Sequence, residues 1–191
     1  MSIESDNQNN RYSRHMYSAG ILPIYVKNET LYFLLGKGTN GEWSDFGGRS
    51  ELKDNNRWDI TACREFYEES IGAIMGYKEI FRKLQNKNNY LKVRSSTLTG
   101  APYYMYVVKI PFEPSYKEKF KSTLSFISYT KNYDTKYLEK IEIQWVSIDT
   151  INAVLDGNAH IVNYPLRKVF MNTLSKHIED IKEFSKRTIF E

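Results

Sequence analysis

The sequence predicts an α/β or α+β layered domain, in which helices pack on a mixed β-sheet. Three observations indicate this class. Short apolar runs of β-type alternate with segments whose apolar residues recur every three to four positions. Hydrophobic residues form 41% of the 191 residues and aromatic residues 15%, which is typical of a globular protein. No internal repeat or linker divides the chain, so we expect a flexible segment at 1–14 and a single domain over 15–191.

The first segments of this domain have the composition of strands. Residues 17–26 and 30–38 are apolar runs, and the turn signal Lys27-Asn28-Glu29 separates them. The stretch "EWSDFGG" (42–48) predicts a short strand that ends in two glycines, which permit unusual backbone angles.

A helix is predicted from about Asn56 to Ile71. Its apolar residues form two neighbouring stripes, Trp58, Ala62 and Phe66 in one and Ile60, Cys63, Tyr67 and Ile71 in the other. Asn55 or Asn56 is the expected N-cap, and Gly72 is the expected end of the helix.

The remainder of the chain continues the alternation. We expect strands at 77–84, 90–98, 103–110 and 141–148, and helices at 114–133, 149–157 and 164–186.

Composition also indicates the compartment. Cys63 is the single cysteine and cannot form an internal disulfide, so a reducing compartment is expected. No apolar run approaches the roughly 18 residues of a membrane span, and the first residues lack a signal-peptide core. We expect a soluble, cytoplasmic protein without a membrane partner.

The net charge of +4 is divided unevenly along the chain. Residues 42–72 hold eight acidic and four basic residues, whereas residues 76–110 hold seven basic residues and one acidic residue. This order suits a metal site that binds phosphate next to a basic surface along which a polyanion could bind. An ordinary solvated surface, with charges that vary along the chain by composition alone, explains the pattern equally well.

The acidic end of the first predicted helix raises the question of a positive partner. Glu65, Glu68 and Glu69 share one helix face, where like charges repel. Mg²⁺ prefers carboxylate oxygens and commonly bridges them to substrate phosphates. The alternative is an exposed charged face, with Arg64 and Glu68 as an ordinary i,i+4 ion pair.

Residues 47–72 resemble the Nudix box, which reads Gly, five residues, Glu, seven residues, then Arg-Glu-apolar-x-Glu-Glu-x-Gly-apolar. "REFYEE" (64–69) matches the helical half at each specified position, and "GGRSE" (47–51) matches the loop half. The predicted strand order is also similar to that family. The resemblance therefore implies a Nudix α/β/α sandwich with a mixed β-sheet over most of the chain.

The loop departs from the family pattern. The spacing from Gly48 to Arg64 is two residues longer, Asp54 stands where the loop glutamate would be, and Gly72 comes one residue late. A longer loop costs little closure entropy. An aspartate can accept the same loop hydrogen bonds. Glu51 resembles a frequent loop glutamate of the family, and a surface role is its equal alternative.

The resemblance also implies the metal site. The family's ligands to Mg²⁺ or Mn²⁺ fall on the carbonyl of Gly48 and on Glu65, Glu68 and Glu69, and Arg64 would orient the carboxylates.

Many family members add a carboxylate just before a "W-V-S" strand. Here Glu139, six residues ahead of Trp145, is the expected ligand or base, and Glu142 is expected to face solvent.

The activity implied by the resemblance is hydrolysis of a nucleoside diphosphate linked to another group, X. A glutamate among Glu68, Glu69 and Glu139 would act as the base. Capped RNA ranks first for X because the basic residues, among them Lys83, Lys87, Lys92 and Arg94, could track RNA between stacking aromatic residues. The alternatives are a small nucleotide substrate and a non-catalytic nucleotide- or RNA-binding module. The oligomeric state stays open.

Overall fold

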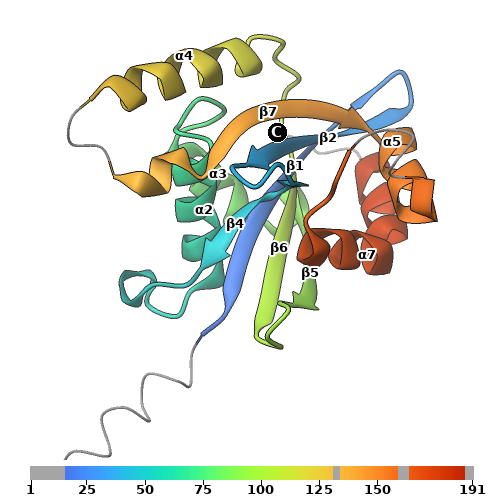
Figure 1. Cartoon of the computed structure of the whole chain (residues 1–191). Coiled ribbons are helices and arrows are strands. Elements are labelled where there is room, and N and C mark those ends of the chain that lie inside the picture. The colour runs from blue at the N-terminus through green and yellow to red at the C-terminus, as the bar shows by residue number, and fades with distance from the viewer. Residues whose placement is uncertain (1–15, 131–133, 159–163, 188–191) are drawn as a thin grey trace, which may run out of the picture.

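A mixed sheet organises the chain (Figure 1). The structure is a computed structural model that describes residues 16–130, 134–158 and 164–187. The segment 1–14, expected to be flexible, lies outside the described residues. The strands are β1 (Ser18–Lys27), β2 (Thr30–Gly38), β3 (Trp43–Ser44), β4 (Phe46–Arg49), β5 (Tyr90–Ser96), β6 (Pro102–Lys109) and β7 (Lys140–Ser147).

The strand order is β3-β2-β1-β6-β5, with β4 also paired to β1 and β7 also paired to β2. β1 and β6 are parallel, whereas the other pairs are antiparallel. The first residues of β1 pair with β4 and its last residues pair with β2, so the sheet divides at the middle of β1. The prediction of a layered α/β class with a mixed sheet is confirmed.

Helices cover both faces of the sheet. They are α2 (Trp58–Glu69), α3 (Tyr77–Leu84), α4 (Tyr116–Tyr129), α5 (Ile148–Ala153) and α7 (Lys168–Lys186), with shorter turns η2 (Leu52–Asp54), η3 (Lys87–Asn89), η4 (Thr135–Leu138) and η5 (Val154–Asn158). Figure 1 shows α2 and α3 on one side of the sheet and α5 and α7 on the other. Each side has its own apolar core, centred on Phe46 and Phe66 under α2 and on Phe33 and Phe170 under α7.

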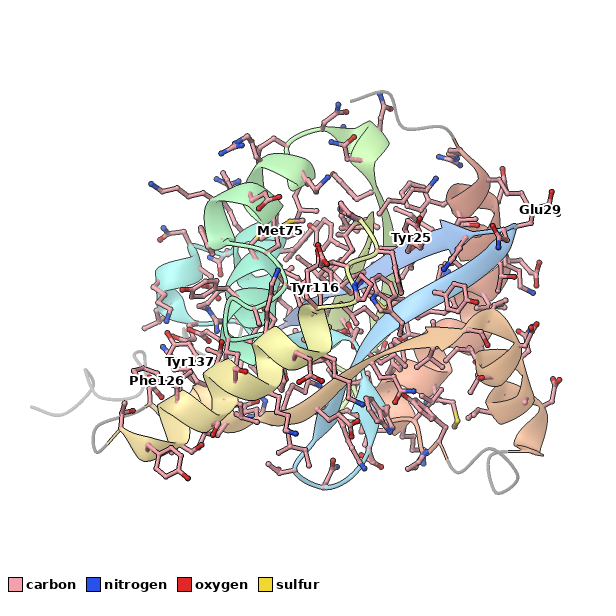
Figure 2. All side chains as sticks on the ribbon, turned by 90° about the horizontal axis from the view of Figure 1, so that it is seen from above. Tyr25, Glu29, Met75, Tyr116, Phe126 and Tyr137 are labelled. Atoms are coloured by element: carbon pink, nitrogen blue, oxygen red, sulfur yellow. The ribbon has the colours of Figure 1, made fainter. Side chains whose placement is uncertain are left out.

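Helix α4 lies across β7 (Figure 2). Its buried residues Tyr116 and Phe120 pack into the α2-side core. Figure 2 shows Tyr116 near one end of α4 and Phe126 near the other, at the end that approaches Tyr137 of η4. Helix α4 therefore brings η4 next to α2. No helix among the described residues is long and apolar enough to cross a bilayer.

The prediction of a strand at 77–84 is wrong, because this segment forms α3. Ile80 and Leu84 are buried one turn apart, and Tyr77 stacks on Phe81 with ring centroids 6.2 Å apart. As a helix, the segment buries these apolar side chains in the core on the α2 side and packs against α2.

The predicted N-cap of α2 is also wrong. Asn55 and Asn56 have φ of 52° and 57°, so they form the left-handed turn ahead of the helix, and Arg57 takes the N-cap position. Ser70 is the C-cap of α2, two residues before the predicted Gly72.

Two further boundaries differ from the prediction. The expected strand at 42–48 is interrupted at Asp45, which separates β3 from β4. The C-terminal helix begins at Lys168, because the backbone of Pro165 and Arg167 hydrogen-bonds to Trp43 at 2.8 and 2.9 Å instead of continuing the helix.

Candidate active site

Helix α2 packs against the glycines of β4. The amide of Gly47 donates a hydrogen bond of 2.7 Å to Oε2 of Glu69. At Gly48, a Cβ atom would lie 2.5 Å from Oε2 of Glu65, which is closer than two atoms can approach without a shift. The bare backbone of β4 therefore lets two carboxylates of α2 lie directly against the strand.

Arg64 connects the helix with the loop before it. Its Nη1 donates to Glu65 Oε1 at 2.7 Å and to Glu68 Oε2 at 3.1 Å. Its Nη2 donates to the carbonyl of Arg49 at 2.8 Å, and its Nε donates to Asp54 Oδ1 at 3.0 Å. The buried guanidinium thus contacts two of the glutamates and connects them with the loop.

Asp54 takes the anchoring position in the lengthened loop. It is fully buried and accepts hydrogen bonds from Arg64, from the amide of Glu51 and from the hydroxyl of Thr61. Burial alone would raise the pKa of Asp54, but these hydrogen bonds outweigh it and lower the pKa below the ordinary value. The extra residues of the loop are accommodated in η2 and the left-handed turn at Asn55 and Asn56.

Two lysines reach the remaining carboxylate oxygens. Lys140, at the start of β7 and only 3% exposed, lies with its Nζ 3.5 Å from Glu69 Oε1 and donates to Ser44 Oγ at 2.7 Å. Lys136 of η4 lies with its Nζ 3.0 Å from Glu68 Oε1. Its side chain is 31% exposed, so it can leave this contact for solvent far more easily than Lys140 can.

Asp45 extends the polar cluster through the sheet. Its carboxylate accepts a hydrogen bond from the hydroxyl of Tyr103, and both residues are 5% exposed. Burial raises the pKa of Asp45, and burial together with the charge of Asp45 raises the pKa of Tyr103. The hydrogen bond from Tyr103 therefore holds the buried carboxylate of Asp45 in place.

Two glutamates of the "REFYEE" segment have raised pKa values. Burial raises the pKa of Glu65 to about 7, although the Arg64 guanidinium opposes this shift. Burial raises the pKa of Glu69 to about 8, with Lys140 opposing it and the Asp45 charge adding to it. The protein holds these carboxylates ready to ionise when a positive partner arrives.

The cluster has the chemistry of a site for a hard divalent cation. In the described part of the chain, the buried carboxylates in and beside this cluster are Asp45, Asp54, Glu65, Glu68 and Glu69. Within the same ranges, no three acidic, histidine or cysteine side chains converge on one point. The carboxylate oxygen donors fit Mg²⁺ or Mn²⁺, and Lys136 occupies one of them.

The distal carboxylate candidates lie in different surroundings. Glu139 ends η4 in an exposed position, and its charge is one of those that raise the pKa of Glu65. Glu142 forms an ion pair of 2.9 Å with Lys117 of α4. The charge of Glu139 therefore reaches Glu65, whereas Glu142 is held by an ion pair with Lys117.

The four basic residues expected to contact RNA do not form one patch. Lys92 and Arg94 lie together on β5, on the face that also carries Trp58 and Tyr104. Lys83 lines a separate cavity with Ile24 and Lys109, and Lys87 lies in η3.

The residues that sequence reasoning missed are Asp45, Lys136 and Lys140. Their partners are remote in sequence: Lys140 lies 96 positions from Ser44, and Tyr103 lies 58 positions from Asp45. No local spacing could reveal these contacts. The one available signal was the position of Asp45 directly before the glycine strand.

Comparison with known proteins gives a likeness of fold. No protein-family model and no curated protein sequence matches this chain. The NUDIX domain of Shewanella oneidensis NrtR, crystallised with ADP-ribose, is similar with a TM-score of 0.50 and 10% identity, over 94% of this chain and 99% of that domain. A C. elegans Ap4A hydrolase in a binary complex gives a TM-score of 0.43 and 14% identity, over 86% of this chain and 98% of its own. The likeness to the NrtR domain shows that this chain has the Nudix fold.

Proposed function

We propose that this chain is a member of the Nudix family and a metal-dependent pyrophosphohydrolase that cleaves a nucleoside diphosphate linked to another group. The observation that carries the proposal is the placement of the "REFYEE" helix. Its glutamates lie against a glycine strand, and Arg64 and Asp54 hold them in place. The likeness to a domain crystallised with ADP-ribose, itself a nucleoside diphosphate derivative, supports the substrate class.

Each residue of the cluster has a role in this chemistry. Glu65, Glu68, Glu69 and the carbonyl of Gly48 would hold Mg²⁺ or Mn²⁺. Bound there, the metal would neutralise the diphosphate and lower the pKa of the attacking water. Arg64 orients Glu65 and Glu68 through its Nη1.

The proton of the attacking water requires a base. The candidates are Glu68, Glu69 and Glu139. Glu69 is 4% exposed and already bonded to Gly47, so it serves better as a ligand than as a mobile base. Glu139 is exposed and free to approach a water at the edge of the cluster, which makes it our first choice.

Capped RNA is the favoured substrate. The exposed cations Lys92 and Arg94 of β5 lie beside Trp58 of α2 and Tyr104 of β6, a combination that suits a polynucleotide beyond the scissile diphosphate. The second candidate is a small nucleotide, such as a nucleotide sugar or a dinucleoside polyphosphate. A non-catalytic binding module is the third, and the complete glutamate set favours catalysis over it.

One panel tests the proposal. Purified protein with Mg²⁺ or Mn²⁺ is offered cap-labelled RNA, free cap dinucleotide, dinucleoside polyphosphates and nucleotide sugars, and the released nucleotides are separated and measured. We expect release from capped RNA, and loss of activity in EDTA. Glu68→Gln and Glu69→Gln should each lower turnover by at least roughly a hundredfold, the usual scale of acid–base catalysis.

Glu183→Gln is the matched control for these variants, because it removes an exposed carboxylate from α7 on the other side of the sheet. It should leave turnover unchanged. Full activity of the Glu68→Gln/Glu69→Gln double variant would overturn the enzymatic proposal. Activity on small nucleotides with none on capped RNA would support the enzymatic proposal and contradict capped RNA as the substrate.

A further inference from the structure

An aromatic pair lies at the start of α2, outside the carboxylate cluster. Trp58, the first residue of α2, stacks on Tyr104 of β6 with ring centroids 4.1 Å apart and planes 14° apart. Tyr17 packs edge-on against Tyr104 at 6.3 Å, which fixes the inner ring to the core. Trp58 is 37% exposed, so the outer ring of the stack faces solvent.

Two cations flank this pair. The Nζ of Lys92 lies 4.5 Å from the Trp58 centroid and 5.9 Å from the Tyr104 centroid, which places the ammonium beside the stacked rings and not over their outer face. The guanidinium carbon of Arg94 lies 5.9 Å from the Tyr104 centroid. The exposed indole face therefore stays free for another flat group. We call Trp58, Lys92, Arg94 and Tyr104 the Trp58 surface.

The strand geometry aligns the two cations. Lys92 and Arg94 are two residues apart on β5, so their side chains leave the same face, and Arg94 lies opposite Tyr104 in the register. β5 is at the edge of the sheet, and both side chains are exposed. Among the described residues, neither cation forms an ion pair with a carboxylate. Their charge is left for a partner from outside.

This combination is selective for one kind of partner. A free indole face accepts a base by stacking, and unpaired cations along a strand accept phosphates. Proteins that bind single strands without reading their sequence combine these two features.

The Trp58 surface also has a fixed relation to the candidate active site. In the sheet register, Tyr104 lies beside Ala19 of β1, and Ala19 lies beside Gly48 of β4. Two strand spacings separate Tyr104 from Gly48, which is about 10 Å. A polynucleotide bound at Trp58 would therefore lie close to a diphosphate held at Glu65, Glu68 and Glu69.

We propose that the Trp58 surface binds a single-stranded polynucleotide, with a base stacked on the indole of Trp58 and phosphates paired with Lys92 and Arg94. The link to the active site rests on the proposed function, because the bound strand would be the part of the substrate that continues beyond the diphosphate. Binding itself does not depend on hydrolysis.

The test measures binding of an uncapped, fluorescently labelled oligonucleotide of about twelve nucleotides in EDTA, where no hydrolysis takes place. Trp58→Leu keeps an apolar side chain but removes the stacking face, and should weaken binding by about 5-fold to 100-fold, the usual range for one stacked base. Lys92→Gln/Arg94→Gln should weaken binding at low salt and reduce the slope of log affinity against log salt by about two. Melting temperatures show that the variants are folded.

The matched controls lie on α4, which packs at the other edge of the sheet. Tyr129→Leu removes an aromatic ring that is 86% exposed, and Lys119→Gln/Lys121→Gln removes two exposed cations. These variants should bind like the unchanged protein. Equal losses in the α4 and β5 variants would show a diffuse charge effect and overturn the proposal, as would unchanged binding by folded Trp58→Leu.

Three probes distinguish the kinds of polyanion that could bind the Trp58 surface. RNA and DNA of the same sequence show whether the 2′-hydroxyl affects binding, and inorganic polyphosphate supplies negative charge without bases. We expect RNA or DNA to bind through Trp58, and polyphosphate binding to be insensitive to Trp58→Leu. Tighter binding of polyphosphate than of either oligonucleotide would overturn the stacking role. Absence of hydrolysis with intact binding would contradict only the proposed function, whereas hydrolysis with no oligonucleotide binding would contradict only this inference.

Discussion

Gly48 of β4 lies directly against the carboxylate of Glu65 on α2. A Cβ there would lie 2.5 Å from Oε2 of Glu65, whereas the neighbouring Gly47 would bring a Cβ to 2.7 Å from the backbone of Gly20. Gly48→Ala therefore displaces a carboxylate, while Gly47→Ala would force two strands apart. We expect Gly48→Ala to lower Mn²⁺ affinity by roughly tenfold or more, the size seen when a ligand's surroundings are disturbed. Isothermal titration with Mn²⁺ measures this change.

Gly76→Ala is the control for this prediction. A Cβ at Gly76 meets no atom within 4 Å, and its φ of −70° suits any residue. Gly76→Ala should leave Mn²⁺ affinity unchanged. Equal affinities of Gly48→Ala and the unchanged protein would mean that Glu65 does not bind the metal.

The raised pKa values of Glu65 and Glu69 predict how metal binding depends on pH. Both carboxyl groups rise from an ordinary value of 4.5, to about 7 and about 8. The folded, metal-free protein thus keeps protons that the unfolded chain has lost, so its stability should fall as pH rises through this range. A metal ion must displace the same protons, so Mn²⁺ affinity should increase up to about pH 8.

Titration in buffers of different ionisation enthalpy counts the protons released when Mn²⁺ binds. Near neutral pH we expect release from the unchanged protein and a smaller release from Glu69→Gln. Mn²⁺ affinity that does not vary between about pH 5 and about pH 8 would contradict the assignment of these glutamates as ligands.

Glu139 and Glu142 allow a paired test of the distal carboxylate. Glu139 acts on the pKa of Glu65, whereas Glu142 is paired with Lys117 at the surface. Glu139→Gln should lower the maximal rate by about 10²-fold to 10⁴-fold, the scale of a general base, without weakening substrate binding. Glu142→Gln should change the rate little. A larger loss of rate in Glu142→Gln than in Glu139→Gln, measured by steady-state kinetics, would show that Glu139 is not the base.

At the scale of elements, local patterns predicted most of the fold. The period of α2 was visible because this helix buries one face, and the apolar runs of β1, β2 and β6 were visible because consecutive residues of these central strands are buried on both faces. The segment of α3 was ambiguous, because eight residues with mixed aromatic and aliphatic side chains fit either period. Its helical form follows from packing against α2, which the local sequence does not contain.

The candidate site was predictable in part for a related reason. The glutamates and Arg64 belong to one helix, so their spacing revealed them. Lys136 and Lys140 come from η4 and β7, and they meet the glutamates of α2 only through tertiary contacts, among them the packing of η4 against α2. These contacts are set by tertiary structure, and a motif of consecutive residues cannot report them.

The η4 turn therefore predicts a competition between a lysine and a metal ion. Lys136 and Mn²⁺ would use the same oxygen atoms of Glu68, and a partly exposed ion pair contributes about 0.2–1 kcal/mol. Lys136→Gln should raise Mn²⁺ affinity by roughly 2-fold to 5-fold, in keeping with that energy.

Lys182→Gln provides a close match, because its side chain is 33% exposed and pairs with Glu179 of α7 at 2.7 Å. It should not change Mn²⁺ affinity in the same titration. Weaker binding of Mn²⁺ by Lys136→Gln would instead show that Lys136 supports the site with metal bound.

At the scale of the whole molecule, charge is separated in space as well as in sequence. The acidic segment supplies the carboxylates between α2, β4 and β7, while Lys92 and Arg94 of the basic segment lie at the β5 edge. From β4 through β1 and β6 to β5 there are three strand spacings, about 14–15 Å, which is short enough for one substrate to contact both. The diphosphate would meet the metal site, and the following phosphates would meet cations.

This arrangement predicts how substrate preference depends on salt. A capped RNA offers phosphates to Lys92 and Arg94 that a free cap dinucleotide lacks, and each neutralised phosphate adds salt-sensitive affinity. At low salt, kcat/KM for capped RNA should therefore exceed that for free cap, and the ratio should shrink as salt rises. Lys92→Gln/Arg94→Gln should flatten this dependence, whereas Lys119→Gln/Lys121→Gln on α4 should preserve it. Equal kcat/KM for both substrates at low salt would mean that the RNA chain does not reach the β5 edge during catalysis, and would favour a small nucleotide as the substrate.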